Sequence, residues 1–136
     1  MRGTSVQLLV EPRPVEDVLT VDCIASRRGQ QLTVLISNHQ VPRSPIRAEH
    51  VHLHLRGLAG VRSVSLERID EQHANPRRAW IEMGSPPYPD RAQLRVLADA
   101  SELRRETVEW TRDEGGASIN LLVPPHSVVG LSLEAS

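Results

Sequence analysis

The chain has 136 residues, enough for one domain with a buried core and too few for two comfortable ones. Its formal net charge of −1, from 16 basic and 17 acidic residues, gives no broad attraction to nucleic-acid phosphates or to an anionic membrane. We therefore expect one domain over residues 1–136, with neither nucleic acid nor a membrane as a partner.

The N-terminal stretch MRGTSVQLLVEPRP contains no long apolar run and no small-residue cleavage site after one. It indicates no signal peptide and no membrane span, so we expect a cytoplasmic location, while the pattern does not establish Met1 as the native start. Cys23 is the only cysteine, which excludes an internal disulfide. Its apolar neighbours at the same parity predict a buried strand thiol rather than a reactive nucleophile.

The segment DVLTVDCIASRRGQQLTVLISNH, residues 17–39, contains two apolar runs around an Arg-Arg-Gly-Gln turn. The first run alternates, with Thr20, Asp22 and Ser26 largely on the other face, which predicts a hairpin with one face in solvent. The apolar face of that run comprises Leu19, Val21, Cys23 and Ala25. Two prolines in the following VPRSPIR favour a loop or a sheet edge.

Two further strands are predicted at residues 49–58 and 61–69. In the first, Val51, Leu53 and Leu55 alternate with three histidines. The second repeats the alternation with one slip of parity after Val61, which indicates a β-bulge.

The period changes to a helical one at Asn75. Asn75 is a capping residue, Pro76 fits the first helical position, and Gly84 with Pro86 is a stop signal. A second helix is predicted from Asp90, with Gln93 at the capping-box position, to about Ser101. One stripe of this helix carries Leu94, Leu97 and Ala98.

Strands resume at residues 106–111, 117–123 and 128–135. The sum is about seven or eight strands with a two-helix insertion at about residues 75–101. The predicted fold class is therefore all-β, an antiparallel β-sandwich with a short helical insertion.

Histidines offer the most visible candidates for metal binding. His50, His52 and His54 share one strand face, with His39 expected on a neighbouring strand, and imidazoles two residues apart can chelate zinc or nickel. No cysteine or obvious carboxylate completes the set, so a solvated strand face is favoured and these three are weak candidates only. No phosphate loop or Cys-x-x-Cys pair is present, and we expect neither a metal nor a cofactor.

The stretch ERIDEQHANPRRAWIEMGSPPYP, with the later LRVLADASELR and LLVPPHSVVGLSL, resembles the C-terminal part of glycoside hydrolase family 39 over roughly residues 17–133. That family includes bacterial β-xylosidases and is related to the α-L-iduronidases. The resemblance implies that the chain corresponds to an accessory β-sandwich, whose helix-bearing loop leans against a catalytic (β/α)8 barrel. It also implies a retaining glycosidase acting on xylo-oligosaccharides or a related glycoside, with that barrel as the partner of this chain.

Acidic residues of the chain do not match the family's catalytic pattern. The family's acid/base lies in an Asn-Glu dipeptide, which is absent here, and Asp70 and Glu71 are strand neighbours whose side chains point to opposite faces. We therefore assign no catalytic residue to this chain, and whether it counts as an enzyme by itself is left open.

The helical segment is the predicted contact with the barrel. Trp80 either packs at a helix–sheet junction, which we favour, or presents its ring to the barrel or to a sugar. The predicted barrel-contact residues are His73, Asn75, Pro76, Arg77, Trp80, Met83 and Tyr88.

Two other classes of function remain as alternatives. A stand-alone carbohydrate-binding module is one, although Trp80, Trp110 and Tyr88 are the only aromatic residues of the Phe, Trp and Tyr types. The other is a structural module that forms homo-oligomers through its sheet edges or its helical loop.

Overall fold

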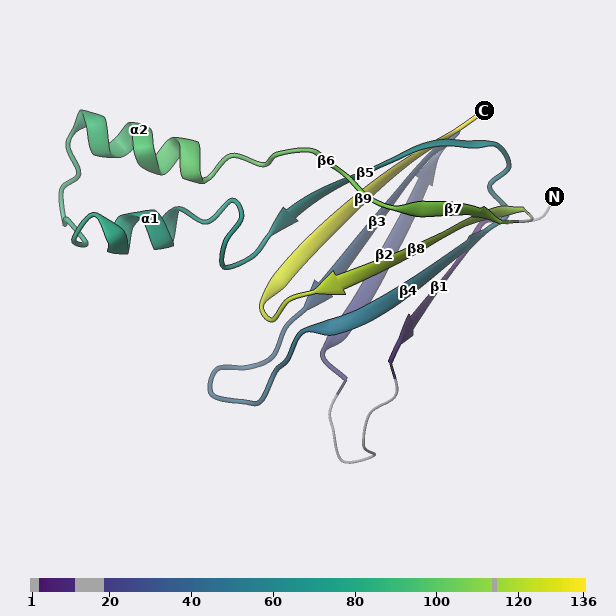
Figure 1. The fold of residues 1–136 in the computed structure, drawn as a ribbon, viewed down its shortest axis with the longest axis horizontal. Coiled ribbons are helices and arrows are strands. Elements are labelled where there is room, and N and C mark those ends of the chain that lie inside the picture. The colour runs from purple at the N-terminus through teal and green to yellow at the C-terminus, as the bar shows by residue number, and fades with distance from the viewer. Residues whose placement is uncertain (1–2, 12–18, 114) are drawn as a thin grey trace.

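The computed structural model describes residues 3–11, 19–113 and 115–136. Its strands form two antiparallel sheets packed face to face, with a pair of helices projecting from one end (Figure 1). The C-terminus lies at the opposite end from the helices (Figure 1). An all-β sandwich with a two-helix insertion is therefore confirmed.

Each sheet is assembled from strands that are distant in the sequence. The four-stranded sheet has the order β1 (Ser5–Val10), β4 (Glu49–Arg56), β8 (Gly116–Val123) and β7 (Trp110–Asp113). The five-stranded sheet has the order β2 (Val21–Arg28), β3 (Gln31–Asn38), β9 (Ser127–Ala135), β5 (Val61–Ile69) and β6 (Glu106–Thr107).

The core lies between the two sheets and follows the predicted alternation. Leu53 of β4, Ile36 of β3 and Leu131 of β9 are each 0% exposed. The predicted hairpin turns at Gly29, whose φ of 60° lies in the left-handed region that glycine adopts without strain. The predicted bulge is also present, as a register shift between Val61 and Ser63 against β9.

Three details of the strand prediction were wrong. β1 was not predicted, and residues 106–111, taken as one strand, divide between β6 in one sheet and β7 in the other. Leu19 is 57% exposed, Cys23 is only half-buried and Ala25 is exposed, because β2 is an edge strand among the described strands. The start of the predicted first strand, residues 17 and 18, lies outside the described residues.

The helical insertion forms an arm, which we define as residues 70–105 between β5 and β6. It contains α1 (Pro76–Glu82) and α2 (Arg91–Ala100), which pack against each other while neither packs extensively on a strand (Figure 1). Neither helix contains a buried residue. Among the described residues, no helix is long and apolar enough to cross a membrane.

Candidate functional site

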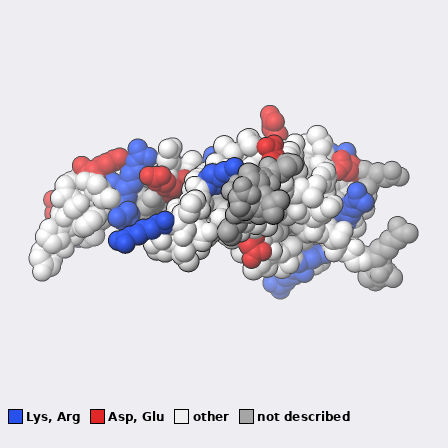
Figure 2. All heavy atoms as spheres, turned by 90° about the horizontal axis from the view of Figure 1, so that it is seen from below, with Lys and Arg blue, Asp and Glu red and all other residues white. Residues whose placement is uncertain are grey.

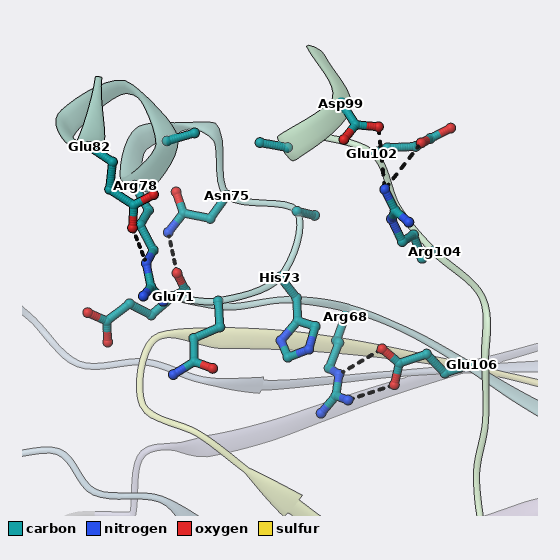
Figure 3. A pocket seen from close by; sticks show the side chains of 14 residues that line it. Arg68, Glu71, His73, Asn75, Arg78, Glu82, Asp99, Glu102, Arg104 and Glu106 are labelled. Atoms are coloured by element: carbon teal, nitrogen blue, oxygen red, sulfur yellow. Dashed lines mark hydrogen bonds and ion pairs between the residues drawn. The ribbon is translucent and has the colours of Figure 1, made fainter. Parts of the chain in front are cut away.

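A polar cavity of about 410 Å³ lies at the root of the arm. One of its walls follows the chain from β5 into α1, and the other is the return from α2 to β6 (Figure 3). Charged and polar side chains dominate its lining: Arg68, Glu71, Gln72, His73, Asn75, Arg78, Glu82, Asp99, Glu102, Arg104 and Glu106.

Asp70 fixes the chain where it leaves β5. Its side chain is 5% exposed, and Oδ1 accepts hydrogen bonds from the backbone N–H groups of Gln72 and His73, both at 2.8 Å. The His73 ring nitrogen Nδ1 lies 2.7 Å from the same oxygen. A buried carboxylate that accepts these hydrogen bonds stabilises the turn that follows β5.

The environment of Asp70 shifts its acidity. Burial by itself raises the pKa of this carboxyl, but hydrogen bonds from His73 and from the backbone of Gln72 outweigh that effect. The net result is a pKa of Asp70 below its ordinary value. Asp70 therefore stays ionised at neutral pH, which suits a structural anchor.

Ion pairs occupy most of the acidic side chains around the cavity. Arg68 Nη2 lies 2.6 Å from Glu106 Oε2, and Arg78 Nε lies 3.0 Å from Glu82 Oε1 (Figure 3). Arg104 lies between Asp99 and Glu102, at 3.4 and 4.0 Å. Charges of both signs lie together where the arm joins the sandwich (Figure 2).

These pairs engage Glu82, Asp99, Glu102 and Glu106 in contacts within the chain. The arrangement is suited to holding the arm on the sheet.

The arm is stabilised by local signals that the sequence predicted. The Asn75 side chain accepts from Arg77 N–H and caps α1, and Asp90 forms a complete capping box with Gln93 on α2. Trp80 lies inside the arm rather than at a helix–sheet junction, since its indole N–H donates to the Pro86 carbonyl at 2.9 Å.

The seven predicted barrel-contact residues occupy two places. His73 and Asn75 line the cavity, whereas Pro76, Arg77, Trp80, Met83 and Tyr88 lie along α1 and the turn after it. Sequence reasoning missed Arg68, Glu106 and Arg104, because ion pairs between distant segments leave no local pattern. An aspartate can accept hydrogen bonds from the backbone two and three residues later, so Asp70 could have been predicted from the sequence to form a turn.

The three strand histidines do not converge on a metal site. His52 Nδ1 lies 2.6 Å from Asn120 Oδ1 and His54 Nδ1 lies 3.0 Å from Ser118 Oγ, on the outer face of the four-stranded sheet. Within the described parts of the chain, no three His, Cys, Asp or Glu side chains are grouped to hold a metal ion. His39, expected on a neighbouring strand, instead follows β3 of the other sheet, and its ring lies against that of His126, with centroids 5.7 Å apart.

The two packed sheets and the projecting arm define a β-sandwich module with a helical insertion. The chain belongs to glycosyl hydrolases family 39, whose family model matches residues 12–118. It is 45% identical over 116 residues to a β-xylosidase of Caldicellulosiruptor saccharolyticus, a match that covers 85% of this chain and 24% of that protein.

Solved structures share the fold. A monomeric β-xylosidase from Caulobacter crescentus CB15 superposes with a TM-score of 0.70 at 22% identity, covering 83% of this chain and 26% of that one. The family 39 enzyme from Xanthomonas axonopodis pv. citri gives a TM-score of 0.58 at 21% identity, with 84% and 26% covered. The chain thus spans about a quarter of the length of these relatives.

Proposed function

We propose that this chain is the non-catalytic sandwich of a β-xylosidase-like retaining glycosidase. The observation that carries the proposal is that the chain matches only 24% of a β-xylosidase, which leaves room there for a catalytic domain. A (β/α)8 barrel needs about 250 residues, more than this whole chain provides. In this proposal the barrel, on the same or a separate polypeptide, supplies the two catalytic carboxyl groups.

The arm is the part of the chain that lies against that barrel and shapes its active-site rim. Its helices have 7 and 10 residues and bury none of them, although Ile81 and Leu94 are apolar and 49% and 54% exposed. Helices this short are marginal in water without tertiary packing. A second surface against the arm would supply the packing that the sandwich does not.

The substrate class in this proposal is xylo-oligosaccharides or a related glycoside. Retention of configuration requires a nucleophile and an acid/base about 5 Å apart, both placed on the barrel. The arm contributes by restricting water and by positioning the sugar next to those groups, because small displacements of substrate lower rates strongly.

Two variants in the native gene test the role of the arm. Trp80→Ala with Met83→Ala removes its apolar anchors, and we expect about a tenfold lower kcat/KM on an aryl β-xyloside. The control is Leu9→Ala with Val41→Ala, which trims two exposed apolar residues outside the arm, 43% and 60% accessible, whereas Trp80 and Met83 are half-buried. The native assembly is purified with an antibody against the chain, and both activity and thermal unfolding are measured.

Full activity with unchanged thermal unfolding in the arm variant would overturn the role of the arm. The mass of the purified native species tests the wider proposal. A band several times 15.1 kDa, or a co-purifying glycosidase, supports it. A species near 15.1 kDa with no xylosidase activity and no companion protein contradicts it.

A further inference from the structure

The two outer faces of the sandwich differ in chemistry. On the four-stranded sheet, the central strands β4 and β8 direct His50, His52, His54, Ser118 and Asn120 outward. Two of these histidines already bond to neighbours on the same face. The same face also exposes Leu9 beside His52 and Leu122 beside His50, but its central strands carry mainly polar side chains, which suits contact with water.

The outer face of the five-stranded sheet is almost free of charge at its centre. Strands β3 and β9 present Thr33, Leu35 and Ser37 beside Val128, Gly130 and Ser132. None of these six residues is ionisable. Depletion of charged residues at the centre of a surface is the compositional mark of an interface core.

Apolar side chains on this face run diagonally from the middle of the sheet to the end where β5 leaves it. Leu35 pairs with Ile24 of β2, and Val128 pairs with Ile69 of β5. The four residues Ile24, Leu35, Ile69 and Val128, which we call the apolar patch, are 68%, 47%, 47% and 42% exposed. A group of exposed apolar residues on neighbouring strands marks a contact surface more often than scattered ones do.

The position of the apolar patch indicates which part of a larger enzyme covers it. Ile69 is the last residue of β5, and the arm begins at the next residue, so the Val128–Ile69 side of the patch lies at the end of the sheet from which the arm projects, while Ile24 and Leu35 extend it toward the middle of the sheet (Figure 1). A domain that packs against the root of the arm therefore also lies next to the patch. The relatives provide such a body, since about three quarters of their length lies outside the match.

We infer that the catalytic part of the family 39 enzyme packs on the outer face of the five-stranded sheet, centred on Leu35 and Val128, while the outer face of the four-stranded sheet remains in solvent. This inference rests on the proposed function, because it names the surface through which the sandwich is joined to the barrel. It assigns a contact to the sheet itself in addition to the arm.

Hydroxyl-radical footprinting of the native assembly and of the isolated 136-residue chain tests the assignment. We expect Ile24, Leu35 and Ile69 to react about fivefold more slowly in the assembly than in the isolated chain, as buried interface residues do. Leu9 and Leu122, which are 43% and 53% exposed on the other sheet, should react equally in both.

A charge insertion provides a second, matched test. Leu35→Asp with Val128→Asp should weaken association of the sandwich with the catalytic part about tenfold or more, because an interface would bury two unpaired carboxylates. Leu9→Asp with Leu122→Asp adds the same charges to the other sheet and should leave association unchanged. The four residues are 42–53% exposed in the chain alone, and thermal unfolding of each isolated variant checks that the fold is retained.

The possible results distinguish an error in the assigned face, in the domain that covers it and in the proposed function. Protection of Leu9 and Leu122 instead, or no effect of the Leu35 and Val128 variant on an intact assembly, would overturn the assigned face while leaving the proposed function in place. Protection that appears in the isolated chain as its concentration rises would assign the patch to a second copy and overturn the barrel as its occupant. Absence of any catalytic companion would remove the proposed function itself.

Discussion

Arg68 on β5 and Glu106 on β6 form a two-point ion pair across the place where the arm leaves and rejoins the sheet. Nε lies 3.3 Å from Oε1, and Nη2 lies 2.6 Å from Oε2. Each side chain is 32% exposed, so the pair is only partly screened by water. Arg68 and Glu106 are 38 residues apart in the chain, and their pair therefore connects the two strands from which the arm leaves and to which it returns.

Glu106→Gln should loosen the arm without unfolding the sandwich. A pair with two hydrogen bonds at the edge of a sheet contributes about 1 kcal/mol or less once solvent screening is included. We expect faster amide hydrogen exchange in residues 70–75 and 101–105, with little change in the thermal midpoint. The control is Glu82→Gln, which breaks an exposed pair inside α1 and should leave exchange at the arm root unchanged. Equal exchange in wild type and both variants would contradict the role of the pair.

Asp70 makes the stability of the protein depend on pH in a predictable direction. Its pKa is lowered in the folded state, so the ionised form stabilises the fold above the unfolded pKa of about 4. That contribution is lost as pH falls through the lower, folded pKa. Asp70→Asn should therefore reduce the free energy of unfolding by about 1–2 kcal/mol at pH 6–7, through weaker hydrogen bonds to the turn.

Denaturant unfolding of wild type and Asp70→Asn from pH 7 down to about pH 3 measures this effect. The difference in free energy between the two proteins should shrink as the pH falls. A difference that stays constant over this range would show that the charge of Asp70 does not contribute. Glu71→Gln, at the exposed neighbouring position, is the matched control and should show no such trend.

Asn38 joins the two sheets through hydrogen bonds to backbone carbonyl groups. Its side chain is buried, and Nδ2 donates to Arg47 O at 2.8 Å and to Val123 O at 3.1 Å, at the end of β8. Asn38→Ala leaves these carbonyls without that donor, and we expect a loss of about 2–4 kcal/mol in the free energy of unfolding. Urea denaturation measures it, with the exposed Asn120→Ala as control, and a loss as small as that of the control would contradict the prediction.

Local patterns predicted most of the sheet residues because each strand has one face in the core. In β4, Val51, Leu53 and Leu55 are 0% exposed while the histidines between them are not buried, as the alternation requires. The helices were equally predictable, because Asn75 and Asp90 are N-cap residues that mark where α1 and α2 begin. In both cases the signal lies within a few residues of the element that it defines.

Tertiary arrangement was not predictable in the same way. Residues 106–111 have one strand-like pattern, yet the chain crosses from one sheet to the other between Thr107 and Trp110. β1 went unrecognised because Leu9 interrupts its alternation and its inward residues are only half-buried against β4. Likewise, the Arg68–Glu106 pair at the candidate site depends on the path of the arm, which no short window of sequence contains.

Tyr88 separates docking of the arm from folding of the arm. Trp80 donates a hydrogen bond within the arm, so its loss disturbs both, whereas Tyr88 is 91% exposed in the chain alone. We expect Tyr88→Ala to leave the thermal midpoint of the isolated chain unchanged, since an exposed side chain contributes little to folding. In the native assembly, if the arm forms the active-site rim, the same variant should lower kcat/KM on an aryl β-xyloside about fivefold or more, because the ring would lose its contact there. Tyr88→Phe keeps the ring and should retain most of the activity, while an equal loss in both variants would assign the effect to the hydroxyl group. Wild-type kinetics for Tyr88→Ala would contradict a contact through this residue.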